Sequence, residues 1–259
     1  MGRTDDRDAD LAAVTGDAAP PRPPGLDRTR ILTAAIDFID THGLAALTMR
    51  RLGAQLGVEA MALYRYVPGR EDLLDGVVAT VVDSLFDDDD QPDEIHLEHA
   101  RGWQDFLVRM AHGVRRIALA HPAVFPLVAS RPPAAPWVRP PLRSLRMVES
   151  FLAAMQQGGF PDEAAVAAYR AYTSFLLGHL LLEVTQLGAQ VSLLDMPEGN
   201  PDARASTDLS PYPHVTDLEP LLGQDRSARE FEDALENLLD RLTQLLHEAR
   251  SEDGPALDI

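Results

Sequence analysis

One stretch, residues 48–74, constrains the fold of this chain more than any other. Leu52, Leu56 and Leu63 recur at helical spacings on either side of a Gly57–Val58 break, which predicts two short amphipathic helices joined by a tight turn. This arrangement is typical of a helix-turn-helix, whose second helix lies in the major groove of DNA and reads base edges from its exposed positions. The first hypothesis is therefore DNA binding.

The chain is longer than its helix-turn-helix requires. A stretch this short buries little core of its own, whereas the whole chain has 259 residues, so a second and larger domain is expected. We predict an all-α fold in four parts: a disordered N-terminal arm at 1–25, a three-helix helix-turn-helix domain at 26–73, a helical effector-binding and dimerisation domain at 74–250, and a flexible tail at 251–259.

Composition and motifs exclude several classes of protein. The absence of Cys removes disulfides, zinc-thiolate sites and cysteine nucleophiles, and it suits a reducing cytoplasm. The most apolar run, 175–182, is far shorter than a membrane span, and the N-terminus lacks the apolar segment of a signal peptide. We therefore expect a cytoplasmic protein with no membrane partner. Because no nucleophile elbow, P-loop, dinucleotide fingerprint or zinc spacing occurs, we expect no enzyme activity, no catalytic residue, no metal and no cofactor.

Charge is unevenly distributed along the chain. The net charge of −18 argues against DNA binding by the chain as a whole, because attraction to phosphate depends on cationic side chains. Between residues 22 and 73, however, seven Arg accompany six acidic residues, so this segment carries +1 and the remainder carries −19. The sequence thus predicts a near-neutral, arginine-bearing head on an acidic body that repels nucleic acid elsewhere.

The helices of the head follow from caps and periodicity. The first is expected to begin at Leu26 or Asp27 and to end at His42–Gly43, with a buried stripe made of Ile31, Ala35, Phe38 and Ile39. Thr48 stands where the N-cap of the second helix belongs. The recognition helix is predicted at 59–66, and a long helix over 70–85 is expected to couple the head to the body.

The body is predicted to begin with an amphipathic helix that follows Trp103 and ends at His121–Pro122. The prolines after it predict an irregular connection, because proline interrupts helices. We expect this connection to be lined with Phe125, Leu127, Val128 and Trp137.

The rest of the body is expected to contain three more helices and one long loop. The helices are predicted at 142–155, where Gly158–Gly159 closes the helix, at 162–187, and from Asp225 or Ser227 onward. The stretch 192–224 contains several prolines and is predicted to be a partly disordered loop. The helix at 162–187 is apolar on almost every side, so it requires more burial than its own domain offers.

The motif LGVEAMALYRYVPGREDLL, preceded by LTMRRLGAQ, resembles the DNA-binding domain of the TetR (tetracycline repressor) family of bacterial transcriptional regulators over about fifty residues. The resemblance implies that Thr48 and Arg50 contact phosphates or an outer base. It further implies that the triplet Ala60, Met61 and Ala62 faces bases, that Tyr64 and Tyr66 bind phosphate through their polar edges, and that Arg70 clamps phosphate.

The base-facing triplet is unusually apolar. Ala60 and Ala62 cannot form bidentate hydrogen bonds with bases, so direct reading would depend on thymine methyl groups and on Arg65, which suits the O6 and N7 atoms of guanine. For Met61, contact with DNA and ordinary packing are equally supported. Arg22 on the N-terminal arm could enter a minor groove, although a solvated tail is the favoured interpretation of the arm.

The C-terminal half more weakly resembles the ligand-binding body of the tetracycline repressors, through VASRPP, QQGGF and SFLLGHLLLEV. A histidine of those repressors helps to hold the drug's magnesium, and this sequence has Leu127 at the aligned position, which argues against a metal-chelated tetracycline. His179 and Glu183 are one helical turn apart, but two ligands do not make a metal site. We interpret His179 as a packing residue or a polar contact in a pocket.

The resemblance also implies a homodimer through helices near 162–187 and 227–248.

These patterns favour a ligand-responsive, dimeric regulator that binds a double-stranded DNA operator, most simply as a repressor released by a small, largely apolar effector. The effector pocket is predicted to be lined with Trp103, Phe106, Met110, Phe125, Trp137, Tyr172, Phe175 and His179. The alternative is a helical adaptor or interaction protein without sequence-specific DNA binding, against which the Arg and Tyr positions of the head argue. Steep salt dependence of DNA binding would distinguish the two.

Overall fold

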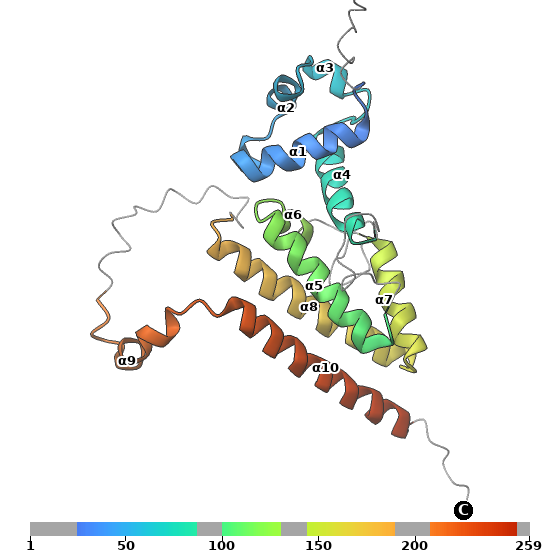
Figure 1. Ribbon diagram of the computed structural model, residues 1–259, viewed down its shortest axis with the longest axis vertical. Coiled ribbons are helices and arrows are strands. Elements are labelled where there is room, and N and C mark those ends of the chain that lie inside the picture. The colour runs from blue at the N-terminus through green and yellow to red at the C-terminus, as the bar shows by residue number, and fades with distance from the viewer. Residues whose placement is uncertain (1–24, 87–99, 131–143, 190–207, 253–259) are drawn as a thin grey trace, which may run out of the picture.

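The computed structural model describes residues 25–86, 100–130, 144–189 and 208–252, and within these ranges the protein contains helices and no strand (Figure 1). The all-α prediction is confirmed. In chain order the helices are α1 Arg28–His42, α2 Met49–Leu56, α3 Ala60–Leu63, α4 Arg70–Asp83, α5 Trp103–Ala120, α6 Phe125–Ser130, α7 Leu145–Gln157, α8 Asp162–Gln186, α9 Pro213–Leu222 and α10 Ser227–Glu252, with 3-10 turns η1 Leu44–Ala46 and η2 Ser84–Phe86.

The head consists of α1, α2, α3 and the first turns of α4. The Asp27 carboxylate accepts a hydrogen bond from the backbone N–H of Arg30 at 2.8 Å and so caps α1. The expected stripe of α1 is buried, and α1 packs on α4 on one side and on α2 on the other. These contacts make α1 the support beneath the helix-turn-helix.

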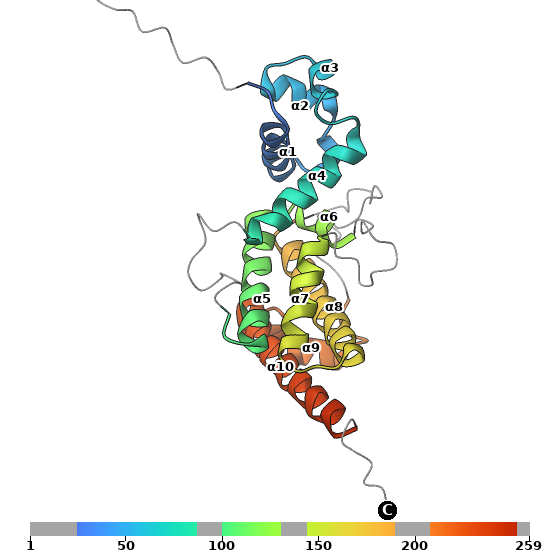
Figure 2. The ribbon, with the colours of Figure 1, turned by 90° about the vertical axis from the view of Figure 1, so that its right-hand side faces the viewer.

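α4 joins the head to the body. Its first half lies against α1, while Val82 and the following Leu85 of η2 are buried against the body, where α4 contacts α5 and α6 (Figure 2). A displacement at the body end of this helix therefore acts directly on the support of the head.

The body is a bundle in which α8 lies at the centre, in contact with α5, α6, α7 and α10. The buried hydroxyl of Tyr172 on α8 donates to the backbone carbonyl of Leu107 on α5 at 2.7 Å. At the far end of α10, Arg250 donates to the carbonyl of Gly158, which joins α10 to the turn between α7 and α8. Hydrogen bonds thus tie α8 to α5 and α10 to the rest of the bundle.

Two segments predicted to be irregular contain helices. α6 lies within the proline-rich connection, and Pro126 is its second residue, where a missing backbone N–H leaves no helical hydrogen bond unmade. α9 lies within the predicted loop at 192–224, and Pro213 occupies its first position for the same reason. The early position of proline explains α6 and the start of α9, whereas Pro220 lies inside α9, where its missing N–H leaves one helical hydrogen bond unmade.

The recognition helix is shorter than predicted. α3 ends at Leu63, after which a turn continues to Val67, whose N–H donates to the carbonyl of Leu63 at 2.9 Å. Pro68 follows directly. A proline disfavours helical backbone angles in the residue before it, here Val67, so the helix does not continue. The N-terminal arm, the acidic run 87–93, Trp137 and the tail after 252 lie outside the described residues.

Candidate DNA interface and ligand cavity

The helix-turn-helix is held in shape by backbone caps and a close helix contact. The Thr48 hydroxyl accepts the N–H of Arg51 at 3.2 Å, as the N-cap prediction requires. Gly57 has a φ of +70°, which glycine adopts without steric cost, and it turns the chain between the two helices. A Cβ on Gly53 of α2 would lie 2.9 Å from the Val58 carbonyl oxygen, so even the methyl group of alanine would not fit there without a shift of the backbone.

The outer surface of the head carries the residues predicted to contact DNA. Met61 is 74% exposed, the two Tyr side chains beside it are also exposed, and Leu63 is fully buried as expected. Ala60 and Ala62 are half-buried. The remaining candidates are exposed and come from the N-cap and first turn of α2, the turn after α3 and the first residue of α4, namely Thr48, Arg50, Tyr64, Arg65, Tyr66 and Arg70. α2 and α3 lie at the end of the molecule farthest from α10 (Figure 1).

Two arginines of the head hold its backbone in place, a role that the sequence analysis missed. The Arg28 guanidinium on α1 donates to the carbonyl of Tyr66 at 3.1 Å, and the Arg51 guanidinium donates to the carbonyl of Ala46 at 3.2 Å. Arg28 and Tyr66 are 38 residues apart, so no local sequence pattern predicts their contact.

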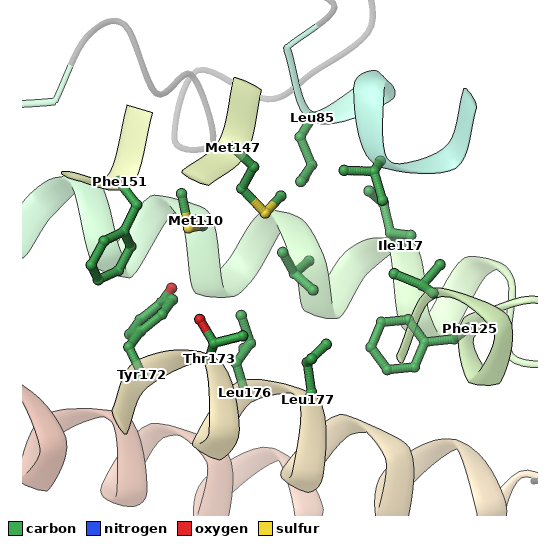
Figure 3. Close-up of a pocket in the computed structure, with 13 residues that line it drawn as sticks. Leu85, Met110, Ile117, Phe125, Met147, Phe151, Tyr172, Thr173, Leu176 and Leu177 are labelled. Carbon is green, nitrogen blue, oxygen red and sulfur yellow. The ribbon is translucent and has the colours of Figure 1, made fainter. Parts of the chain in front are cut away.

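A cavity lies in the body between α4, α5, α6, α7 and α8 (Figure 3). The space inside it that a water-sized molecule can reach is about 20 Å³, so the lining side chains must move apart to admit a larger ligand. The lining consists of Val82, Leu85, Met110, Val114, Ile117, Phe125, Val128, Met147, Phe151, Tyr172, Thr173, Leu176 and Leu177. Because Val82 and Leu85 belong to α4 and its extension η2, any molecule in this cavity contacts the helix that supports the head.

The cavity departs from the predicted pocket. Of the predicted residues, Met110, Phe125 and Tyr172 line it, whereas Trp103, Phe106, Phe175 and His179 do not. Trp103 lies in the first turn of α5 and packs edge-on against the ring of Phe160, 5.1 Å between centroids. Periodicity identified these residues as buried but could not identify the neighbour that buries them.

Phe175 and His179 lie on the opposite face of α8, toward α10. Their rings are 6.1 Å and 5.3 Å from the ring of Phe231 on α10. Glu183, one turn after His179, is buried and accepts two hydrogen bonds from the Arg115 guanidinium, at 2.5 and 3.1 Å. Glu183 therefore pairs with an arginine of its own chain. In the described part of the chain, no cluster of three or more potential metal ligands occurs.

One side-chain contact bridges the head and the body directly. Nδ1 of His121, at the end of α5, lies 2.6 Å from Oδ2 of Asp40 on α1, and both side chains are partly buried. His121 also precedes α6, which contributes Phe125 to the cavity. The cavity thus connects to α1 through α6 as well as through α4.

The phenols of α8 carry no charge near neutral pH. Burial raises the pKa of Tyr169 to about 12, an effect that the nearby Thr173 hydroxyl partly opposes. Burial also raises the pKa of Tyr172 well above its usual value, because the phenolate would lose its hydration. The lining of the cavity is therefore uncharged.

Both halves of the molecule have counterparts among known proteins. Residues 31–77 match the bacterial regulatory proteins of the tetR family, and residues 97–246 match the tetracyclin repressor-like C-terminal domain. The second match alone covers more than half of the chain. The chain belongs to the TetR family. This family consists of transcriptional regulators rather than enzymes.

Individual relatives of this TetR-family protein are distant. An HTH-type transcriptional regulator of Saccharopolyspora erythraea is 29% identical over 160 residues, which make up 62% of each chain, so the match spans less than two thirds of that relative. The class D tetracycline repressor of Escherichia coli is 26% identical over 215 residues, 83% of this chain and 88% of the repressor.

A solved structure shares the arrangement of head and body. The crystal structure of a possible TetR family transcriptional regulator from Streptomyces coelicolor A3(2) is 29% identical, has a TM-score of 0.64, and covers 85% of this chain and 100% of its own. Among the described residues of the present protein, none of the helices combines the length and hydropathy needed to cross a bilayer.

Proposed function

We propose that this TetR-family protein is a homodimeric repressor that leaves its DNA operator when a small, largely apolar molecule occupies the cavity. The observation that carries the proposal is the position of α4, which packs on α1 at one end and lines the cavity with Val82 at the other. A ligand that favours one position of α4 therefore favours one spacing of the two recognition surfaces of a dimer.

DNA contacts are assigned to the exposed side of the helix-turn-helix. In this proposal Arg50, Arg70 and the two exposed Tyr contact phosphates, Arg65 reads a base, and Met61 contacts a thymine methyl group. The exposure of Met61 supports a contact with DNA over a packing role. The acidic body would be repelled by phosphate, which favours approach through the head.

The dimer is assigned to α8 and α10. α8 and α10 pack against each other (Figure 1), and α8 exposes apolar side chains beside its buried ones. Leu182 is 68% exposed and Val166 is also exposed. A second copy of the same surface would cover them in an isologous four-helix contact.

The effector is proposed to bind without a metal. Leu127, which aligns with a magnesium-holding histidine of the tetracycline repressors, is buried in α6 and offers no metal ligand. The ligand implied by the name of the class D repressor is therefore not carried over to this protein.

Selection of bound fragments from random DNA tests the proposal. The expected result is a palindromic sequence whose half-sites lie about one helical turn apart, roughly 10 base pairs. Enrichment of no sequence would favour the adaptor alternative, which neither the family nor the relatives support. Enrichment of a single unsymmetric site would contradict the dimer.

A further inference from the structure

The cavity contains a hydroxyl group with unused hydrogen-bonding capacity. Thr173 on α8 is 2% exposed, and its Oγ1 has no hydrogen-bond partner of normal geometry among the described residues. Figure 3 shows this oxygen pointing into the space between α8 and α5. The phenol of Tyr169, one turn earlier, interacts with this hydroxyl, but not at hydrogen-bond geometry.

Thr173 differs in this respect from other helical hydroxyls of the protein. Ser and Thr within helices commonly donate to the carbonyl four residues earlier. Four other side chains here do so at 2.6 to 2.9 Å, although each is more exposed than Thr173: Thr41, Ser130, Thr243 and Ser251. Because an unpaired buried hydroxyl is unfavourable, a hydrogen bond between Thr173 and a ligand would favour binding.

No other polar group of the described lining is available to a ligand. The Tyr172 hydroxyl already donates to the carbonyl of Leu107, and burial keeps this phenol neutral by raising its pKa. All other described lining side chains are hydrocarbon or thioether. A charged ligand would therefore lose its hydration without meeting an opposite charge.

We propose that the effector is a neutral, mainly hydrocarbon molecule with one hydroxyl or carbonyl group, and that Thr173 forms the hydrogen bond to this group. The inference rests on the proposed function, since it requires the cavity to be the effector site. It adds the chemical class of the ligand and the residue that discriminates it from a pure hydrocarbon.

Three probes of one ring system test this inference: naphthalene, 2-naphthol and 2-naphthoate. Their dissociation constants are measured by equilibrium dialysis against the full-length protein and its variants. Thr173→Val replaces only the hydroxyl by a methyl group, Thr173→Ser keeps the hydroxyl, and Thr243→Val removes a hydroxyl that is bonded within its own helix.

The ratio of the naphthalene and 2-naphthol dissociation constants should fall about 5- to 10-fold in Thr173→Val, which is the value of one net hydrogen bond. Thr173→Ser and Thr243→Val should keep the wild-type ratio. 2-Naphthoate should bind at least about tenfold more weakly than 2-naphthol, because its charge is buried unpaired. Thr173→Val should also raise the midpoint of thermal unfolding without probe, which confirms that the variant is folded.

The possible failures are distinguishable. If the ratio is the same in wild type and Thr173→Val, the assignment of Thr173 is wrong while the cavity remains the proposed effector site. Tight binding of 2-naphthoate would overturn the neutral class of ligand. If the wild-type protein binds none of the three probes, the cavity itself, and with it this part of the proposed function, is refuted.

Discussion

Arginine has two distinct uses in the head of this protein. Arg28 and Arg51 direct their guanidinium groups to backbone carbonyls, which fixes the recognition turn on α1 and the start of α2 on the preceding turn. Arg50, Arg65 and Arg70 are exposed and make no hydrogen bond within the described part of the chain. The side chains of the second group can therefore contact nucleic acid without breaking a hydrogen bond of the protein.

Substitution of the exposed arginines should separate phosphate contacts from base contacts. Arg50→Ala and Arg70→Ala should weaken binding to all sequences and reduce the slope of log K against log salt by about 0.9 each. Arg65→Ala should instead reduce discrimination at one base pair by about 1 to 3 kcal/mol. Fluorescence anisotropy with the selected operator and its single-base variants, at several salt concentrations, measures both quantities.

Arg28→Ala is the matched control for this series. It removes the same charge, but one N–H group of its guanidinium is bonded to the Tyr66 carbonyl. We expect weaker binding with an unchanged salt slope. A slope reduced as in Arg50→Ala would mean that Arg28 contacts DNA, and unchanged binding in all three exposed-arginine variants would show that the recognition surface is placed wrongly.

At the contact between α2 and α3, backbone lies too close to Gly53 to leave room for a side chain. Gly53→Val should destabilise the protein by about 1 to 3 kcal/mol, because its side chain would meet the Val58 backbone and force the two helices apart. The free energy of unfolding in urea measures this effect. Ala54→Val introduces the same side chain at the exposed neighbouring position, where we expect a loss of about 0.5 kcal/mol. Equal losses would contradict the geometry of the turn.

The contact between α1 and the end of α5 should be measurable as a coupling energy. A double-mutant cycle with Asp40→Asn and His121→Gln is expected to give about 1 to 3 kcal/mol for this partly buried pair. The more exposed pair of His112 and Glu232, whose atoms are 3.6 Å apart, serves as the control and should give less than about 1 kcal/mol. A coupling near zero for the first pair would remove α6 as a second connection between cavity and head.

Local patterns were sufficient to predict most helices but not their neighbours. The stripe of α1, the Thr48 cap and the long helices follow from caps and spacings within one turn of the chain. On α8, however, Tyr172 and Phe175 have similar apolar character, and only the fold reveals that one faces the cavity and the other faces α10. The contacts of Arg28 with Tyr66 and of Asp40 with His121 could not be predicted either, because each joins residues far apart in the sequence.

For the whole molecule, the proposed dimer can be tested directly by substitutions at exposed leucines. Leu182→Glu places a charge on the exposed apolar face of α8 and should convert a dimer into a monomer at micromolar concentration, with loss of operator binding. Leu145→Glu introduces the same charge at an exposed leucine of α7 and should leave the dimer intact. Analytical ultracentrifugation measures both variants. A stable wild-type monomer would refute the proposed dimer outright.

The bond from Arg28 to the carbonyl of Tyr66 also bears on which genomic sites the protein could serve. A recognition turn anchored to α1 has little freedom to swivel, so each half of a dimer would present its reading surface at a fixed angle. One inserted base pair rotates the second half-site by roughly 34 to 36° about the DNA axis. A head held in this way cannot follow that rotation, so the DNA would have to twist, which would reduce the free energy of binding. We therefore expect operators of one spacing only.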